Sequence, residues 1–388
     1  MVSYIGEFIS SLKKALKQSS ENLIKDPLLR KRIRVQIQNA QMMKHFRLDW
    51  LANQTKEIDI FDYETNIKPK FHKYTELYRG NTLYGNERVM NVYSGHRKPI
   101  KGCIEHGLYF GETTFDTEIK DTGLPALLTY SEVRKNHIRK KSDICTIAVG
   151  PYIHYANAIE EIKINAIRKS LGKTLLVFPM HSTDVIKCEY DIEEYIKYIR
   201  KFSEDKKFQS VIICMFYRDI ELGRDKKYID AGYKIVSAGY KVDPFFLERL
   251  KSIFLISDYV LTNDVGTHVG YAVYLNKPVF IWKQNRKYSG RGKNDVLENV
   301  PTEKFESANN EKNEIYEAFS NYSENISNCQ FELCKKYWGF DCVRSKKEMK
   351  KILDDLDDIF ELSIRKKISF AEAIKSLKEV RSDTIQWR

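Results

Sequence analysis

The sequence predicts an α/β protein whose parallel sheet is covered by helices, with further helices at both ends of the chain. From residue 166 onward, apolar strand-like runs alternate with amphipathic stretches. Strands that are apolar along their whole length are typical of a parallel sheet buried on both faces. The length of 388 residues exceeds the usual size of one domain. We therefore expect a basic helical segment (1–53), two α/β halves (54–155 and 156–303) and a final helical segment (304–388).

Residues 1–53 are rich in basic residues and have a helical pattern. Between Leu23 and Leu51, apolar residues recur at helical spacing among lysines and arginines. This pattern is typical of a solvated helix face, and also of an amphipathic helix pair lying on an anionic membrane surface. No apolar run approaches the about 20 residues that span a bilayer, and the first residues do not resemble a signal peptide. We expect a cytoplasmic protein, with peripheral membrane contact as a second interpretation.

The segment from 57 to 150 contains short apolar runs separated by turn residues. Four of these runs have the composition of strands, namely KEIDIFDY, RVMNVYSG, KGCIEHGLYF and DICTIAVG. The stretches between them fit helices or loops equally well, so the pattern predicts α/β content without a topology.

The second half has a clearer pattern. Its predicted strands are KTLLVFPM, SVIICMFY, KIVSAG, YVLTN and PVFIW, and EEYIKYIRKF is an amphipathic helix. Asp243 and Pro244 begin another helix in the preferred order, with Asp as N-cap and Pro at the first helical position. A further helix is expected to begin near Val265. Residues 304–388 carry apolar stripes among charges, which predicts helices that return to the first half or pair with another subunit.

Composition narrows the possible partners. The formal net charge of +12 favours an anionic partner, such as a nucleic acid, an anionic membrane or a nucleotide-sugar. No helix-turn-helix, RNA-binding aromatic motif or zinc finger is present, so we expect no nucleic-acid partner. The seven cysteines lack the paired spacing of a zinc site. We expect no metal site.

The strongest candidate site follows the predicted strand YVLTN. Asp264 ends this strand region, and Gly266, Thr267 and His268 occupy the first turn of the next predicted helix. Unpaired backbone N–H groups and the helix dipole favour an anion there. Thr267 adds a hydroxyl donor, and His268 adds a donor that is cationic when protonated. The sequence predicts a phosphate site, and an ordinary helix start with a structural histidine is the alternative.

Two further strand ends carry polar residues. His181, Ser182 and Thr183 follow KTLLVFPM, and Gly239 lies at the end of KIVSAG. Ligands of open α/β sheets bind at the carboxyl ends of strands. The first group therefore fits a diphosphate, and Gly239 fits a base or ribose. A helix-capping loop is the alternative at both positions.

In the first half, Glu105 and His106 end an apolar run beside Gly107. Transfer to a hydroxyl group with inversion requires a general base near pH 7, a task that suits histidine. Glu105 is a second candidate for the base, or the residue that orients the imidazole, and Glu112 is a weaker one. The sequence does not place Asp121 or Arg134, which are possible neighbours of this site. A structural histidine is the alternative.

The second half resembles the C-terminal domain of GT-B glycosyltransferases that build bacterial surface polysaccharides, closest to the capsule and teichoic-acid polymer transferases. The resemblance rests on His106-Gly107, on the SDYVLT run Ser257–Thr262, and on the LNKP run Leu275–Pro278. The teichoic-acid enzymes usually have Asp-Tyr-Ser-Ser where this chain has the residues from Asn263 to His268. This departure disfavours a glycerol-phosphate donor and favours a sugar linked to UDP, GDP or CMP.

The resemblance implies a GT-B-like architecture of two Rossmann-like domains facing a central cleft, with the donor bound by residues 156–303 and the acceptor by 54–155. It implies metal-independent transfer of a sugar from a nucleotide-sugar donor to a glycan or lipid-linked glycan acceptor. The base is His106 or Glu105, and no cofactor is required. Two alternatives stay open: a nucleotide-sugar epimerase of the same architecture, with several carboxylates around the donor, and a non-catalytic glycan- or nucleotide-binding assembly protein.

Overall fold

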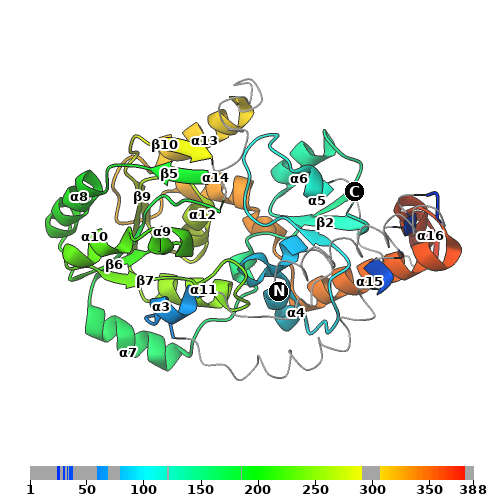
Figure 1. Ribbon diagram of the computed structural model, residues 1–388, viewed down its shortest axis with the longest axis horizontal. Helices are drawn as coiled ribbons and strands as arrows, with labels where there is room; N and C mark the ends of the chain where they lie inside the picture. Colours follow the sequence, from blue (N-terminus) through cyan, green and yellow to red (C-terminus); the bar gives the residue numbers. More distant parts are fainter. Residues whose placement is uncertain are drawn as a thin grey trace, which may run out of the picture.

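A computed structural model describes residues 24–26, 29–30, 33, 35–37, 59–68, 79–119, 122–184, 186–290 and 306–380. These residues form a mixed α/β structure with two separate parallel sheets (Figure 1). Most of the basic segment 1–53 lies outside the described residues, and so does Asp121. The prediction of membrane contact by that segment therefore stays a prediction.

The larger sheet has five parallel strands in the order β7-β6-β4-β8-β9. They are β4 (Thr174–Phe178), β6 (Ser210–Cys214), β7 (Lys234–Val236), β8 (Tyr259–Thr262) and β9 (Val279–Ile281), and all five were predicted from the sequence. The chain proceeds outward from β4 to β7 and then returns to β8 on the other side of β4. The order of strands therefore reverses between β4 and β8, where the loops after the two strands diverge and ligands commonly bind.

Helices cover both faces of this sheet. Alternate residues of β4 belong to two apolar clusters: Leu175 and Val177 pack with α8, whereas Leu176 and Phe178 pack with α11 and α12. The helices of this half are α7 (Glu161–Leu171), α8 (Ile192–Asp205), α9 (Tyr217–Glu221), α10 (Asp225–Asp230), α11 (Phe246–Leu255) and α12 (Thr267–Tyr274). An antiparallel pair that the sequence did not indicate, β5 (Ile186–Glu189) and β10 (Lys287–Gly290), lies beside them.

The smaller sheet has three parallel strands in the order β1-β2-β3. They are β1 (Cys103–Ile104), β2 (Ala126–Thr129) and β3 (Cys145–Ala148). The predicted strands KGCIEHGLYF and DICTIAVG are confirmed as β1 and β3, and β2 was missed. The other elements of this half are α3 (Tyr63–Asn66), η1 (Arg79–Gly85), α4 (Asn86–Ser94), α5 (Asp116–Ile119), α6 (Glu132–Arg139) and η2 (Tyr152–His154).

Two predicted strands of the first half are wrong. RVMNVYSG forms most of helix α4, because Val89, Met90 and Tyr93 recur at helical spacing and pack into the core. Gly95, in the left-handed conformation with φ 74°, ends this helix. KEIDIFDY has no strand among its described residues, and its last residue, Tyr63, begins α3.

The predicted start of the helix after Asp243 is shifted. Helix α11 begins at Phe246 rather than at Pro244. Asp243 still accepts a hydrogen bond from the backbone N–H of Phe245 at 2.9 Å, so it stabilises the turn that enters the helix. Asp243 also forms an ion pair with Arg249 at 2.7 Å.

The C-terminal helices run from the larger sheet to the smaller one (Figure 1). They are α13 (Glu306–Phe319), α14 (Asn328–Trp338), η4 (Phe340–Cys342), α15 (Lys346–Lys366) and α16 (Phe370–Val380). Helix α14 packs against both α12 and α6, and α15 packs against α4. The prediction that the final helices return to the first half is confirmed. None of the helices that the structure describes combines the length and the apolar character needed to cross a bilayer.

Candidate functional site

A cavity of about 300 Å³ lies where strand ends of the two sheets meet. The larger sheet contributes residues that follow β4, β6, β7 and β8, and the smaller sheet contributes residues that follow β1 and β2. The predicted site residues that line it are His106, His181, Thr183, Gly266, Thr267 and His268, together with Gly107. Sequence positions up to 162 residues apart therefore share one cavity, because the carboxyl ends of parallel strands lie at one edge of each sheet.

The wall after β8 is the N-terminus of α12. Gly266 is the N-cap, and no side chain caps this terminus. The first N–H groups of the helix are therefore available to a ligand. A Cβ at Gly266 would lie 2.9 Å from His268 Nδ1, so only glycine fits here without moving the imidazole. This geometry supports the phosphate-site interpretation of the loop.

His268 is held in a fixed orientation. Its ring stacks on Phe178 with a centroid distance of 4.9 Å, and its Nε2 donates to Thr262 Oγ1 at 3.0 Å. Burial, and then the neighbouring His181, lower the pKa of His268 to about 3. The ring is therefore neutral near pH 7 in the ligand-free chain, and the expectation of a cationic donor is corrected for that state.

The loop after β4 forms the adjacent wall. The ring of His181 packs on Phe216 with a centroid distance of 4.7 Å, and its side chain stays exposed. The surrounding protein lowers the pKa of His181, while the carboxylates of Asp219 and Asp264 oppose this effect. Thr183 Oγ1 accepts a hydrogen bond from the backbone N–H of Ile186 at 3.1 Å, which closes a short turn.

On the opposite wall, His106 is paired with a carboxylate. Its Nδ1 lies 2.8 Å from Glu118 Oε1, and the side chains of His106 and Glu118 are 34% and 4% exposed. Because a carboxylate oxygen accepts a hydrogen bond, Nδ1 carries the proton and Nε2 carries the lone pair. The hydroxyl of Tyr109 donates to Nε2 at 2.5 Å. This arrangement fits a general base whose orientation is set by a buried acid.

The two walls are in direct contact. The backbone N–H of Leu108, two residues after His106, donates to Thr267 Oγ1 at 3.2 Å. The indole N–H of Trp338 in α14 donates to the backbone carbonyl of Thr267 at 3.0 Å. Helix α14 therefore positions the first turn of α12 against the loop that follows β1.

Glu105 is not available as a base, although the sequence named it as one. Its side chain is fully buried, and Arg134 forms an ion pair with Oε1 at 2.6 Å. The hydroxyl of Thr129 donates to Oε2 at 2.5 Å. Arg134 also donates to the backbone carbonyls of Gly111 and Thr113. Glu105 therefore fixes Arg134 and the loop after β1, and Glu118 takes the orienting role.

Glu112, the weaker candidate, points to a different surface. It forms ion pairs with Lys140 and Lys141, each at 2.9 Å. Hydrogen bonds from these two lysines lower the pKa of Glu112 to about 2. It therefore stays ionised, and it does not line the cavity.

Three other predicted residues do not line the cavity either. Ser182 is buried, and its backbone N–H donates to Asp219 at 3.0 Å. Gly239 has φ 109°, and a Cβ there would lie 2.5 Å from the guanidinium of Arg249, so it serves the backbone turn after β7. Asp264 is engaged by Arg286 and by the hydroxyl of Tyr316. These residues therefore support the loops around the cavity.

The sequence analysis missed Glu118, Tyr109 and Trp338. Tyr109 and Glu118 follow His106 by three and twelve positions. An acidic residue close to a candidate histidine in the sequence was a usable signal, but Glu105 and Glu112 gave the same signal. Nothing local to Trp338 indicated its contact with Thr267, because the two residues meet only when α14 packs on α12.

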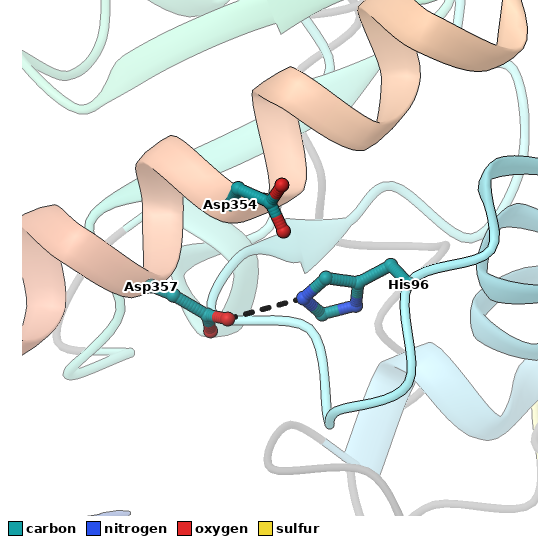
Figure 2. A group of neighbouring side chains, drawn as sticks. All are labelled: His96, Asp354 and Asp357. Carbon is teal, nitrogen blue, oxygen red and sulfur yellow. Dashed lines mark hydrogen bonds and ion pairs between the residues drawn. The ribbon is translucent and has the colours of Figure 1, made fainter.

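A separate cluster joins the loop after α4 to α15 (Figure 2). His96, Asp354 and Asp357 have possible metal-binding atoms within 4.8 Å of one another. However, the amines of Lys98 and Lys101 lie 3.2 and 3.3 Å from Asp357 and already balance its charge. Burial acts to raise the pKa of Asp357, but the hydrogen bond from His96 and the two lysines outweigh it and lower the pKa. We assign this cluster a structural role.

No protein-family model matches the chain, and no curated protein matches its sequence. Among solved structures, the chain is similar to the wall teichoic acid polymerase TagF, with a TM-score of 0.37 and 14% identity over 68% of each chain. It is also similar to S. aureus MnaA in a co-structure with UDP, with a TM-score of 0.36 and 11% identity over 80% of this chain and 87% of that one. A third similar structure is TarM, with a TM-score of 0.26 and 11% identity over 74% of this chain and 51% of that one. Similarity at this level does not identify an activity.

Proposed function

We propose that this chain is a glycosyltransferase of the GT-B type, which moves a sugar from a nucleotide-activated donor to a hydroxyl group of a surface glycan or lipid-linked glycan. One observation carries the proposal. His106, which is paired with Glu118, shares a cavity with the uncapped N-terminus of α12, which begins at Thr267. A base and an anion site in one cavity at strand ends are what transfer from a nucleoside diphosphate requires.

The donor phosphates would lie at the first turn of α12. The N–H groups there and the hydroxyl of Thr267 would stabilise the negative charge that develops on the leaving diphosphate. Because Nε2 of His268 donates to Thr262, this histidine would contact a phosphate oxygen only through Nδ1, after that nitrogen takes up a proton. A nearby phosphate favours this protonation.

The acceptor hydroxyl would replace the hydroxyl of Tyr109 at Nε2 of His106. The acceptor oxygen then attacks the anomeric carbon of the donor sugar, and its proton passes to Nε2. The bond between that carbon and the diphosphate oxygen breaks, and the electron pair leaves with the diphosphate. Glu118 stabilises the imidazolium that forms. Attack from the face opposite the leaving group inverts the anomeric centre, and helix N–H groups balance the diphosphate charge without an essential metal.

The composition of the cavity favours transfer over epimerisation. An epimerase of this architecture would place several carboxylates around the donor, but the described residues that line the cavity include no Asp or Glu. Glu118 lies behind His106 and serves its Nδ1. One histidine base is enough to deprotonate the acceptor hydroxyl in a transfer reaction.

The test measures nucleotide release from UDP-, GDP- and CMP-activated sugars, with and without added cell-surface glycan. His106→Ala should lower the rate by about 10²- to 10⁴-fold, since it removes the general base. His137→Ala is the matched control, because His137 also pairs with a glutamate, Glu311, at 2.7 Å but lies outside the cavity. Equal turnover in the wild type and His106→Ala would contradict the proposal. A chain that binds a nucleotide without any turnover would be a binding protein instead.

A further inference from the structure

One wall of the cavity has no part in the chemistry described above. It is formed by the junction of η1 and α4, where Asn86 is the first residue of α4. Asn86 lines the cavity, although only 1% of its surface is exposed. It is therefore a buried polar side chain at the edge of an open space.

The amide nitrogen Nδ2 of Asn86 has no hydrogen-bond partner among the described residues. Leaving a buried donor unpaired costs free energy of folding, and native structures rarely do so without a reason. The same helix shows the usual arrangement at Asn91, which is equally buried and whose Nδ2 donates to the carbonyl of Lys98 at 3.2 Å. The unpaired donor at Asn86 therefore indicates a ligand group that is absent from the chain itself.

The backbone before Asn86 holds this side chain in place. Gly85 has φ 71°, and a Cβ there would lie 2.4 Å from the carbonyl oxygen of Pro244. The backbone N–H of Tyr84 donates to the carbonyl of Lys241 at 2.6 Å. Because these contacts attach the turn to the second half, Asn86 has little freedom to turn toward another partner.

The charge around Asn86 favours a neutral acceptor over an anion. Glu87 lies in the first turn of α4 and is buried, and its carboxylate accepts from the backbone N–H of Ile100 at 2.7 Å. A carboxylate at this position offsets the positive end of the helix dipole. The donor at Asn86 therefore suits a carbonyl oxygen better than a phosphate.

The surroundings of Asn86 in the cavity are apolar and aromatic. Tyr84 packs on Phe246 with a centroid distance of 4.8 Å, and Leu247 and Leu250 of α11 line the same cavity. Apolar walls with one polar group are typical of sites that orient a small ligand. They accept the face of a planar ring or a methyl group while the amide binds an oxygen.

We propose that Asn86 donates a hydrogen bond to a neutral carbonyl oxygen of the bound nucleotide-activated ligand. This inference rests on the proposed function, because it places that ligand in the cavity. The same carbonyl chemistry has two sources: the base, since uracil, cytosine and guanine carry a ring carbonyl and adenine does not, and the N-acetyl group of an acetamido sugar.

The test combines thermal melting with calorimetric titration of the full chain. The variants are Asn86→Leu, which replaces the amide with an apolar group of similar size, and Asn91→Leu as the matched control. The ligands are UDP, CDP, GDP and ADP, followed by UDP-glucose and UDP-N-acetylglucosamine, which differ by the acetamido group. Asn86→Leu should keep or raise the Tm, because it removes an unpaired buried donor, while it weakens binding by about two- to tenfold. Asn91→Leu should lower the Tm and leave the affinities unchanged.

The pattern of loss identifies the source of the carbonyl. Weaker binding of the preferred nucleoside diphosphate in Asn86→Leu assigns the base, with ADP binding least well to the wild type. Weaker binding of UDP-N-acetylglucosamine alone assigns the carbonyl to the acetamido group. Unchanged affinities for every ligand in Asn86→Leu would overturn the inference and leave the proposed function intact. Failure of the wild type to bind any of these ligands would overturn both.

Discussion

The two walls of the cavity have the same origin in the fold but differ in chemistry. Each wall follows a parallel strand, β1 in the smaller sheet and β8 in the larger one. Behind His106 lies the buried carboxylate of Glu118, which sets the tautomer of a partly exposed imidazole. Behind His268 lies the ring of Phe178, and burial keeps this imidazole neutral. The two histidines therefore differ in the residue that supports each ring, which is a carboxylate for His106 and an aromatic ring for His268.

The largest effect that we expect concerns the cavity wall that carries His106. Glu118→Gln should lower turnover by about 10²-fold, which corresponds to about 2.7 kcal/mol in the activation free energy. The amide would donate to Nδ1 of His106, so the proton would move to Nε2 and the base would lose its lone pair. Nucleotide affinity should not change.

Glu311→Gln is the matched control, because Glu311 accepts from His137 outside the cavity. Steady-state kinetics with the preferred donor measures both variants. Equal turnover in Glu118→Gln and the wild type would show that Glu118 does not set the tautomer of a catalytic His106.

The next effect concerns the cavity wall formed by α12, which α14 supports. A Cβ at Gly270 would lie 2.1 Å from the ring of Trp338, which is fully buried and bonded to Thr267. Gly270→Ala should therefore lower the free energy of unfolding by about 1–3 kcal/mol. It should also weaken nucleotide binding, because α12 must move away from α14.

Gly102→Ala provides a comparison in the smaller sheet. The closest contact of its Cβ would be the end of the Leu356 side chain, at 3.1 Å, and that end can shift. Urea unfolding measures both variants, and Gly102→Ala should lower the free energy of unfolding by less than Gly270→Ala does. An unchanged stability for Gly270→Ala would mean that α14 does not hold the first turn of α12.

The last effect concerns the protonation of His268. Its pKa is about 3 in the folded chain, below the about 6.5 of an unfolded histidine. The unfolded state therefore binds more protons between these two values, and stability falls as the pH drops through this window. The contribution is at most about 1.4 kcal/mol per pH unit, and it is absent above the unfolded pKa.

His268→Gln removes this contribution. The variant should show a flatter dependence of Tm on pH between about 6.5 and 4 than the wild type does. The controlling comparison is His106→Gln, at a histidine that is one-third exposed. An identical pH dependence in the wild type and His268→Gln would contradict a neutral imidazole at this position.

The second half was predictable because its signals are local. Each strand from β4 to β9 in the larger sheet is a continuous apolar run, and strands of this kind alternate with amphipathic helices. The strand ends then place His181 and Thr267 at one edge without further information. The first half has shorter strands, and its helix α4 carries Val89 and Met90 in an order that also fits a strand. The local sequence pattern does not distinguish a helix from a strand at these positions.

The partners of the site residues could not be predicted, because they depend on packing between distant segments. His106 was identified as a base candidate, but its carboxylate is Glu118 rather than Glu105, since Arg134 occupies Glu105. Asp264 follows a strand as a ligand residue would, yet Arg286 binds it from a distant loop. Residue type and spacing locate the edge of the sheet, and tertiary contacts decide which side chains stay free.

The most direct test is a crystal structure of the chain with its preferred nucleoside diphosphate. We predict that the phosphates lie within hydrogen-bond distance of the backbone N–H groups of Thr267 and His268, with His106 across the cavity. A nucleotide bound outside the cavity, or phosphates with no contact to the first turn of α12, would contradict it.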